Sequence, residues 1–311
     1  MQVFRERLVG FLFPAESDKW LAALRIGLGL QVVLYSLSLR SDWNYLFAAE
    51  GNGLVSRELA EAIVSIDSPF VPRLGWLVAA GSHLNLNEGT VLFLAWIFLL
   101  SAGCCLLVGL LSRPSAILAW FLHLCAVKSG GLLSYGMDNF TTIGLFYLMV
   151  GPLPDSYSLD RRIWRAPGKD RHTQGFYRRV LQLHLCLIYL FGGIAKCIGI
   201  GWWNGASLWR ALTRPPFNII PPEILVPWKH VLLFFGIMVC LLEIGYPFFI
   251  WMKSTRLIWF VCILGMHIAI GFTMGLYLFA LIMIILNVAA FGPDFCLTFW
   301  KRRLPFPIKA I

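Results

Sequence analysis

One lysine near the end of a long apolar stretch is the residue best suited to acid–base chemistry. Lys196 follows Gly192 and Gly193 and precedes Trp202 and Trp203. Paired glycines allow a neighbouring helix to approach closely, and burial disfavours the charged form of a lysine. A lysine that is neutral in such a setting can act as a general base.

Other ionisable residues also fall inside apolar stretches, where they are costly and usually face the protein interior. With a rise of about 1.5 Å per residue, we place Glu243 roughly 12 Å, His267 roughly 15 Å and Lys196 roughly 25 Å from the inner boundary of the membrane. We therefore expect Glu243 to pair with His123 or His267 in a mid-membrane layer, either structurally or functionally. Lys196 would lie nearer the outer face. The remaining ionisable residues of these stretches are Arg25, Lys128 and His184.

The composition indicates what kind of element must position these residues. The chain has 311 residues, of which 59% are hydrophobic and 14% charged, and its mean hydropathy is +0.74. Ordinary soluble domains are about 45–50% apolar and about 25% charged. These values argue against a soluble enzyme and against disorder, and they favour a polytopic membrane protein.

The apolar stretches predict an all-α polytopic helical bundle with about eight transmembrane helices, forming one domain over 1–311. A span needs about 20 mainly apolar residues. No internal repeat of the kind found in inverted-symmetry transporters is evident. The predicted spans are 20–39, 90–111, 115–133, 138–152, 179–200, 231–251, 257–273 and 275–291.

The distribution of charge predicts the topology. With both termini cytoplasmic, most of the 26 lysines and arginines lie on the inner side, above all in the basic loop 153–178, as the positive-inside rule requires. This explains much of the net charge of +10 without nucleic acid. The long outer loops 40–89 and 201–230 would cover the outer face, with an amphipathic helix over 54–66 and an apolar patch over 74–80. The expected surroundings are a lipid bilayer, the plasma or inner membrane if the source is bacterial.

The cysteines and the N-terminus indicate no further site. None of the eight cysteines is spaced for a metal or in a Cys-x-x-Cys motif, so we interpret them as small buried hydrophobic residues and expect no metal. We expect no cleaved signal peptide, because the first apolar run is long and lacks a small-residue cleavage site.

Three short segments carry a resemblance that covers most of the chain. The segment 187–196, ending in Gly192-Gly193-Ile194-Ala195-Lys196 and followed by Trp202 or Trp203, resembles the core of vitamin K-dependent gamma-carboxylases. More broadly it resembles the horizontally transferred transmembrane (HTTM) family. Gly265-Met266-His267-Ile268 with 274–279, and 24–29 with Tyr45, Leu46 and Gly51, fit the same family in order and spacing.

The resemblance implies a mechanism. Lys196 would be the base that acts on reduced vitamin K or menaquinone, with O2 and CO2 as co-substrates, in epoxidation coupled to carboxylation of a peptide glutamate. His267 would orient or polarise the reactants. The pocket would be lined by Asp138, Asn139, Gly192, Gly193, Trp202 and Trp203.

Two departures from the family pattern keep other functions open. Asp138-Asn139 stands where the family has a histidine, and Ile268-Ala269-Ile270 stands where it has polar residues. Some short bacterial relatives mature a secreted peptide toxin, so the alternative is a non-catalytic factor whose outer loops bind a secreted peptide or protein. A small-molecule transporter that uses Glu243 is a third hypothesis.

Overall fold

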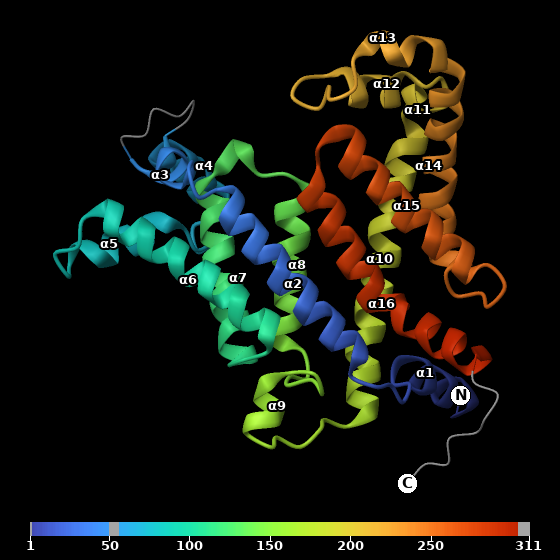
Figure 1. The fold of residues 1–311 in the computed structure, drawn as a ribbon, viewed down its shortest axis with the longest axis horizontal. Helices are drawn as coiled ribbons and strands as arrows, with labels where there is room; N and C mark the ends of the chain where they lie inside the picture. The colour runs from blue at the N-terminus through green and yellow to red at the C-terminus, as the bar shows by residue number, and fades with distance from the viewer. Residues whose placement is uncertain (1, 50–55, 304–311) are drawn as a thin grey trace. The chain divides into compact units, whose positions relative to one another are not determined.

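The computed structural model describes residues 2–49 and 56–303, and every regular element within them is helical (Figure 1). The all-α prediction is therefore confirmed for this part of the chain. The helices are α1 (Gln2–Leu12), α2 (Lys19–Ser38), α3 (Trp43–Phe47), α4 (Arg57–Asp67), α5 (Leu74–Ser82), α6 (Glu88–Val108), α7 (Ser112–Ser129), η1 (Gly131–Leu133), α8 (Gly136–Val150), α9 (Leu159–Ile163), α10 (Arg171–Ile198), α11 (Ile200–Trp203), α12 (Ala206–Thr213), α13 (Pro222–Leu225), η2 (Val226–Trp228), α14 (Lys229–Phe249), α15 (Arg256–Met274) and α16 (Tyr277–Arg303).

Each predicted span coincides with one of these helices, and five segments are long and apolar enough to cross a membrane. The five are Lys19–Ser38, Glu88–Val108, Arg171–Ile198, Pro222–Phe249 and Arg256–Met274, and Tyr277–Pro293 is a shorter apolar helix. A multi-pass membrane protein is thus supported among the described residues. The count of eight stays a prediction, since α7, α8 and α16 do not meet the same criteria.

The chain forms two compact units. Unit 1 comprises Met1–Trp20 and Arg171–Ile311, and unit 2 comprises Leu21–Asp170. Each unit has its own core, so each is described by itself. The prediction of one domain concerns the whole chain and stays a prediction.

In unit 2, helices α6, α7 and α8 pack in sequence order, and a buried arginine ties α2 to the segment after α8. Arg25 Nε lies 2.6 Å from Asp155 Oδ2, and both side chains are almost fully buried. Arg25 also donates to the carbonyl oxygens of Leu106 and Leu107 at 2.6 and 3.1 Å. These contacts satisfy a charge that would otherwise be costly in an apolar interior.

Loop 40–89 contains α3, α4 and α5. The amphipathic helix expected over 54–66 is present as α4, which begins three residues later and ends one residue later, and the apolar patch at 74–80 is α5. Ser56 begins α4 by accepting a hydrogen bond from Leu59 N at 3.3 Å, the usual function of an N-terminal serine cap. Residues 54–55 and Gly51, which contributed to the predictions, lie outside the described residues, as does Ile311.

In unit 1, α10 packs on α14 and α16, α15 packs on α16, and α1 lies against α10 (Figure 1). Helix α10 begins at Arg171, eight residues before the predicted span, so the basic loop is shorter than expected. Arg178 explains this extension, because it pairs with Glu16 at 2.9 Å and donates to Ala290 O at 2.9 Å. Protein contacts thereby stabilise a helical turn that is too polar to be recognised as a membrane span.

Loop 201–230 folds into α11, α12, α13 and η2. Helices α11, α12 and η2 pack on α14, and α13 packs on η2. Leu212, Leu225 and Leu232 form a small buried cluster there. The loop therefore packs against one end of α14, and its position on the outer face stays a prediction.

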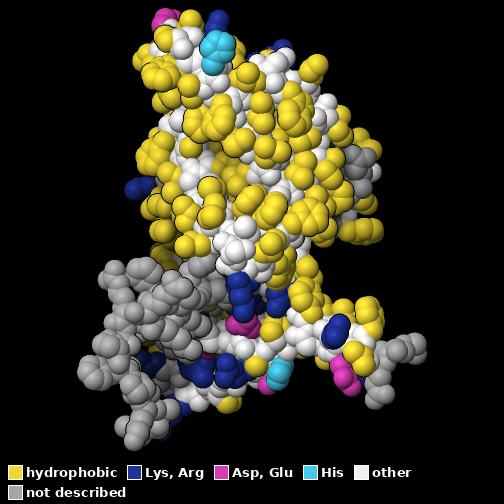
Figure 2. All heavy atoms as spheres, turned by 90° about the vertical axis from the view of Figure 1, so that its right-hand side faces the viewer, with side chains coloured by type: hydrophobic (Ala, Val, Ile, Leu, Met, Phe, Trp, Pro, Cys, Tyr) yellow, Lys and Arg dark blue, Asp and Glu magenta, His cyan; other side chains and the backbone are white. Residues whose placement is uncertain are grey.

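The surface of unit 1 carries many exposed apolar side chains. Figure 2 shows a broad hydrophobic face with Lys and Arg side chains gathered beyond one of its ends. An apolar surface of this extent is unusual on a soluble monomer and suits lipid. Its members on α14 and α15 include Phe234, Phe235, Leu241, Phe248, Leu257, Ile258, Val261 and Phe272.

Candidate functional site

Helix α14 lies close to α10 at Gly193 and close to α11 at Gly236. A Cβ atom on Gly193 would lie 2.8 Å from the backbone nitrogen of Ile244, and one on Gly236 would lie 2.8 Å from the carbonyl oxygen of Trp202. Residue numbers rise along one segment as they fall along the other, so α10 and α14 are antiparallel. The glycines thus serve the close helix packing that the sequence predicted.

Lys196 and Glu243 form an ion pair between these helices. The distance from Lys196 Nζ to Glu243 Oε2 is 2.6 Å, and the side chains are 27% and 9% exposed. Gly192 borders the pair, since a Cβ atom there would lie 3.3 Å from Glu243 Oε2. The ring centroid of Trp202 is 5.6 Å from Nζ, within the range of a cation–π contact. The ammonium group is therefore held on one side and accessible on another.

This pairing corrects the expected partner of Glu243, which was a histidine. The expectation counted depth from the inner ends of the two predicted spans, at residues 179 and 251. In the structure Gly193 is level with Ile244, and from that level α10 extends back to Arg171 whereas α14 ends at Phe249. Because α10 extends much further at this end, Glu243 is level with Lys196, although depth counted from the span ends separated them by roughly 13 Å.

Trp203 has a structural contact at the end of α10. Its Nε1 donates to the carbonyl oxygen of Cys197 at 2.7 Å, which satisfies one of the carbonyl groups that a helix leaves open at its C-terminus. Its side chain is 43% exposed. Trp202, rather than Trp203, is the tryptophan in contact with Lys196.

His267 belongs to a buried hydrogen-bond network deeper in unit 1. Its Nε2 lies 2.8 Å from the hydroxyl of Tyr189. Asn287 Nδ2 donates to that hydroxyl at 2.8 Å, and the Tyr246 hydroxyl donates to Asn287 Oδ1 at 2.8 Å. Within the described part of the chain, His267 Nδ1 is buried with no hydrogen-bond partner.

The predicted base and its helper lie at two levels of unit 1. Tyr189, the partner of His267, precedes Lys196 by seven residues on α10, which is roughly 10 Å along the helix. Glu243 and Tyr246 are three residues apart on α14, so that helix connects the two levels. Sequence reasoning missed Tyr189, Tyr246 and Asn287, although an asparagine within the apolar stretch 275–291 was a usable signal.

Asp138 and Asn139 lie in unit 2, at the start of α8. Asp138 Oδ2 accepts a hydrogen bond from Tyr135 N at 2.9 Å, and its side chain is buried, whereas Asn139 is exposed. The carboxylate of Asp138 therefore stabilises the beginning of α8. A contribution of the two residues to the lysine site stays a prediction.

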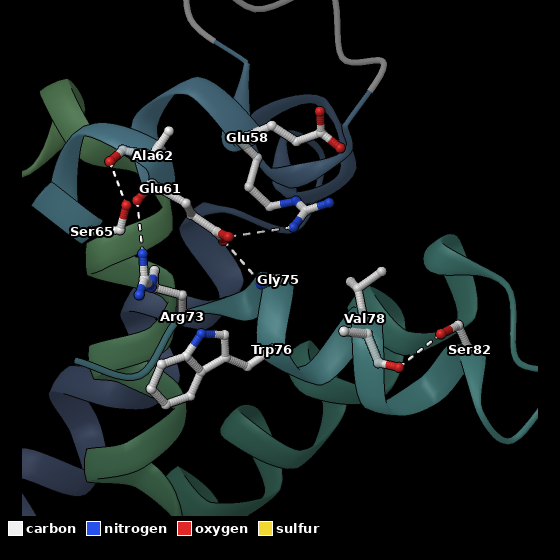
Figure 3. Close-up of a pocket in the computed structure, with 11 residues that line it drawn as sticks. Glu58, Glu61, Ala62, Ser65, Arg73, Gly75, Trp76, Val78 and Ser82 are labelled. Atoms are coloured by element: carbon white, nitrogen blue, oxygen red, sulfur yellow. Dashed lines mark hydrogen bonds and ion pairs between the residues drawn. The ribbon is translucent and has the colours of Figure 1, made fainter. Parts of the chain in front are cut away.

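Unit 2 contains a separate pocket of about 470 Å³ between α4 and α5 (Figure 3). Glu61 is central to it: Arg57 Nη1 lies 3.6 Å from Glu61 Oε2, and Gly75 N donates to Oε1 at 2.9 Å. Arg73 Nη1 donates to the Glu61 carbonyl oxygen at 2.8 Å, and its guanidinium lies 5.4 Å from the Trp76 ring centroid. The sequence placed client binding in this loop without identifying these residues.

The motifs are the basis for any family assignment of this chain. Comparisons with protein-family models, curated proteins and solved structures found no match. The similarity to the HTTM family accordingly stays a prediction from the three motifs.

Proposed function

We propose that the protein is a membrane enzyme in which Lys196 and Glu243 together accept a proton from a reduced quinone. The observation that carries the proposal is the 2.6 Å ion pair, open to the surroundings at Lys196. The resemblance of the 187–196 segment to the gamma-carboxylase core supports the same assignment.

The residues present suit a phenolic headgroup. Trp202 offers an aromatic surface beside the ammonium group, and the free Nδ1 of His267 offers one hydrogen-bonding position deeper in the unit. A reduced menaquinone or vitamin K, when bound, supplies an acidic hydroxyl and the electrons for a reaction with O2. Its isoprenoid tail would lie along the lipid-facing surface of the helices.

The ion pair changes the expected mechanism from a lone neutral lysine to a relay. A protonated lysine cannot itself accept a proton. Lys196 can, however, pass one proton to Glu243 Oε2 while Nζ takes another from the substrate hydroxyl. The negative charge then moves from the carboxylate to the substrate oxygen, and the ammonium group stays beside it. Such fixed charge stabilises an oxyanion where water is excluded.

The test is formation of quinone epoxide by the purified protein in lipid nanodiscs, supplied with chemically reduced menaquinone or vitamin K and O2. Wild type should form epoxide and Lys196→Ala should not, whereas Lys128→Ala, a matched lysine at the end of α7, should resemble wild type. Equal, background-level epoxide from wild type and Lys196→Ala would rule the proposal out. Adding labelled bicarbonate and a glutamate peptide asks whether CO2 is a co-substrate.

The topology belongs to the same proposal. We infer eight spans with both termini cytoplasmic, which places loops 40–89 and 201–230, and hence the Lys196 end of α10, on the extracytoplasmic side. The gathering of Lys and Arg beyond one end of the hydrophobic face supports this orientation (Figure 2). The membrane would be the plasma membrane, or the inner membrane of a bacterium.

The pocket between α4 and α5 favours a second function, a non-catalytic factor for a secreted peptide. It offers both signs of charge and an aromatic ring, which together suit a peptide (Figure 3). Under this alternative, Arg73→Ala would abolish peptide maturation in cells, and Lys196→Ala would leave it intact. The opposite pattern would favour the enzyme.

A further inference from the structure

Two cysteines face each other where α10 and α14 are closest. Gly193 is level with Ile244, and the two helices are antiparallel. One turn further along α10 is Cys197, and one turn back along α14 is Cys240. The register thus sets the cysteines opposite each other.

The glycines near these cysteines let α14 lie close to α10 and to α11. Gly193, one turn before Cys197, lies against the backbone of α14 at Ile244, and Gly236, one turn before Cys240, lies against the backbone of α11 at Trp202. A disulfide requires Cα atoms about 4.4–6.8 Å apart. The absence of a side chain at Gly193, one turn from the pair, favours such a close approach of α10 and α14.

The side chains meet accordingly. The Cys197 and Cys240 thiols are close enough to interact electrostatically, and both are free. Cys240 is buried and Cys197 is partly exposed. Trp203 fixes the backbone at this position through its hydrogen bond to the Cys197 carbonyl oxygen.

We propose that Cys197 and Cys240 are a redox-active dithiol that closes to a disulfide by exchange with a disulfide-bearing molecule. The Cys197 thiolate attacks one sulfur of the incoming disulfide, forming a mixed disulfide and releasing the first thiolate. Cys240 then loses its proton and attacks Cys197 Sγ, which releases the second thiolate. The protein loses two electrons and two protons, and the incoming disulfide becomes two thiols.

This pair lies next to the proposed relay. Cys197 follows Lys196 directly, and Cys240 precedes Glu243 by three residues. A disulfide would therefore fix α10 to α14 beside the ion pair. The proposal does not depend on quinone chemistry, because exchange is measured at the cysteines themselves.

The experiment equilibrates the nanodisc-embedded protein with oxidised and reduced dithiothreitol at varied ratios, followed by acid quenching, alkylation and peptide mass spectrometry. We expect Cys197 and Cys240 to lose alkylation together, with appearance of a cross-linked peptide, while the exposed Cys262 stays alkylated. In the Cys240→Ser variant, Cys197 should stay available to the alkylating reagent. The exception is the fraction of Cys197 held in a mixed disulfide with dithiothreitol.

Independent or absent oxidation of the two cysteines in wild type would overturn the proposal. If Cys240→Ser does not fold, Cys197→Ser gives the reciprocal control, with Cys240 remaining alkylated after oxidation. Epoxide formation is not part of this readout, so a failure here is distinct from a failure of the proposed enzyme.

Discussion

Lys196 Nζ lies 2.6 Å from Glu243 Oε2, which joins α10 to α14 through one lysine and one carboxylate. The glycines at 192 and 193 make this contact attainable, since side chains there would approach Glu243 and Ile244. A base in an apolar environment has to pass on the proton that it accepts. In the proposed relay, the carboxylate of Glu243 accepts that proton from Lys196.

Removing the lysine should destabilise unit 1 more than neutralising the glutamate. Lys196→Ala leaves the carboxylate of Glu243 buried without its counter-charge, whereas Glu243→Gln leaves a lysine that can turn towards water. We expect a loss on the order of 2 kcal/mol for Lys196→Ala and less for Glu243→Gln. Thermal unfolding in one detergent measures both. An equal or reversed order would show that the pair is not buried as described.

Breaking the ion pair of unit 2 should be more damaging still. Arg25→Met removes the guanidinium from Asp155 and leaves that carboxylate with almost no exposure. We expect a loss of about 3–5 kcal/mol, seen as poor yield of monodisperse protein and a lower melting temperature. Arg162→Met, at an exposed arginine, is the control and should unfold as wild type does.

The close approach of α14 to α10 and α11 is testable with single methyl groups. Gly193→Ala and Gly236→Ala place a Cβ atom 2.8 Å from backbone atoms that cannot move aside easily, and each should lower the melting temperature by several degrees. Gly265→Ala on α15 has no atom within 4 Å of its new Cβ. It should be neutral or slightly stabilising, because alanine favours helix by about 1 kcal/mol over glycine. Equal effects at all three positions would refute the close packing.

The network around His267 should matter for binding more than for the proton relay. Tyr189→Phe removes the hydroxyl that contacts His267 Nε2 and Asn287 Nδ2. We expect weaker retention of reduced quinone, roughly tenfold in KM for a lost buried hydrogen-bonding group, with a smaller change in kcat. Phe279→Leu, which removes a ring contact to His267 and leaves its hydrogen bond to Tyr189 in place, serves as the comparison. A fall in kcat alone would place Tyr189 in the chemistry instead.

The topology predicts which positions a membrane-impermeant thiol reagent reaches. In a background lacking the eight native cysteines, Ser82→Cys and Glu223→Cys should be labelled from outside intact cells. Arg162→Cys should be labelled only after the cells are opened. The reverse pattern would invert the orientation and place Lys196 at the cytoplasmic face.

Local patterns were enough to predict the helices, and distant contacts were not predictable. Each predicted span is a helix, because apolar composition and helical length act within one segment. The partner of Arg25 is Asp155, 130 residues away, and no local sequence pattern at either residue predicts the contact. Glu243 was assigned to the wrong layer because α10 extends much further than α14 beyond the level of Gly193 and Ile244, so the span ends were poor markers of depth.

The candidate site was predicted in part. Lys196, its glycines and Trp202 do come together, because they are close in sequence and lie along one helix end. Glu243 was singled out from the sequence but with the wrong partner. Only the packing of helices α10, α14 and α16 showed the places of Tyr189, Tyr246 and Asn287. Where a resemblance rested on short motifs, it pointed to the lysine but not to the carboxylate that changes its chemistry.

The most direct test of the relay is a double-mutant cycle on the rate of epoxide formation, using Lys196→Ala, Glu243→Gln and the variant that carries both changes. Residues that act as one unit are not additive. The account predicts that all three variants are slowed to the same residual rate in protein that remains folded. Full activity of Glu243→Gln, or additive losses from the two changes, would contradict it.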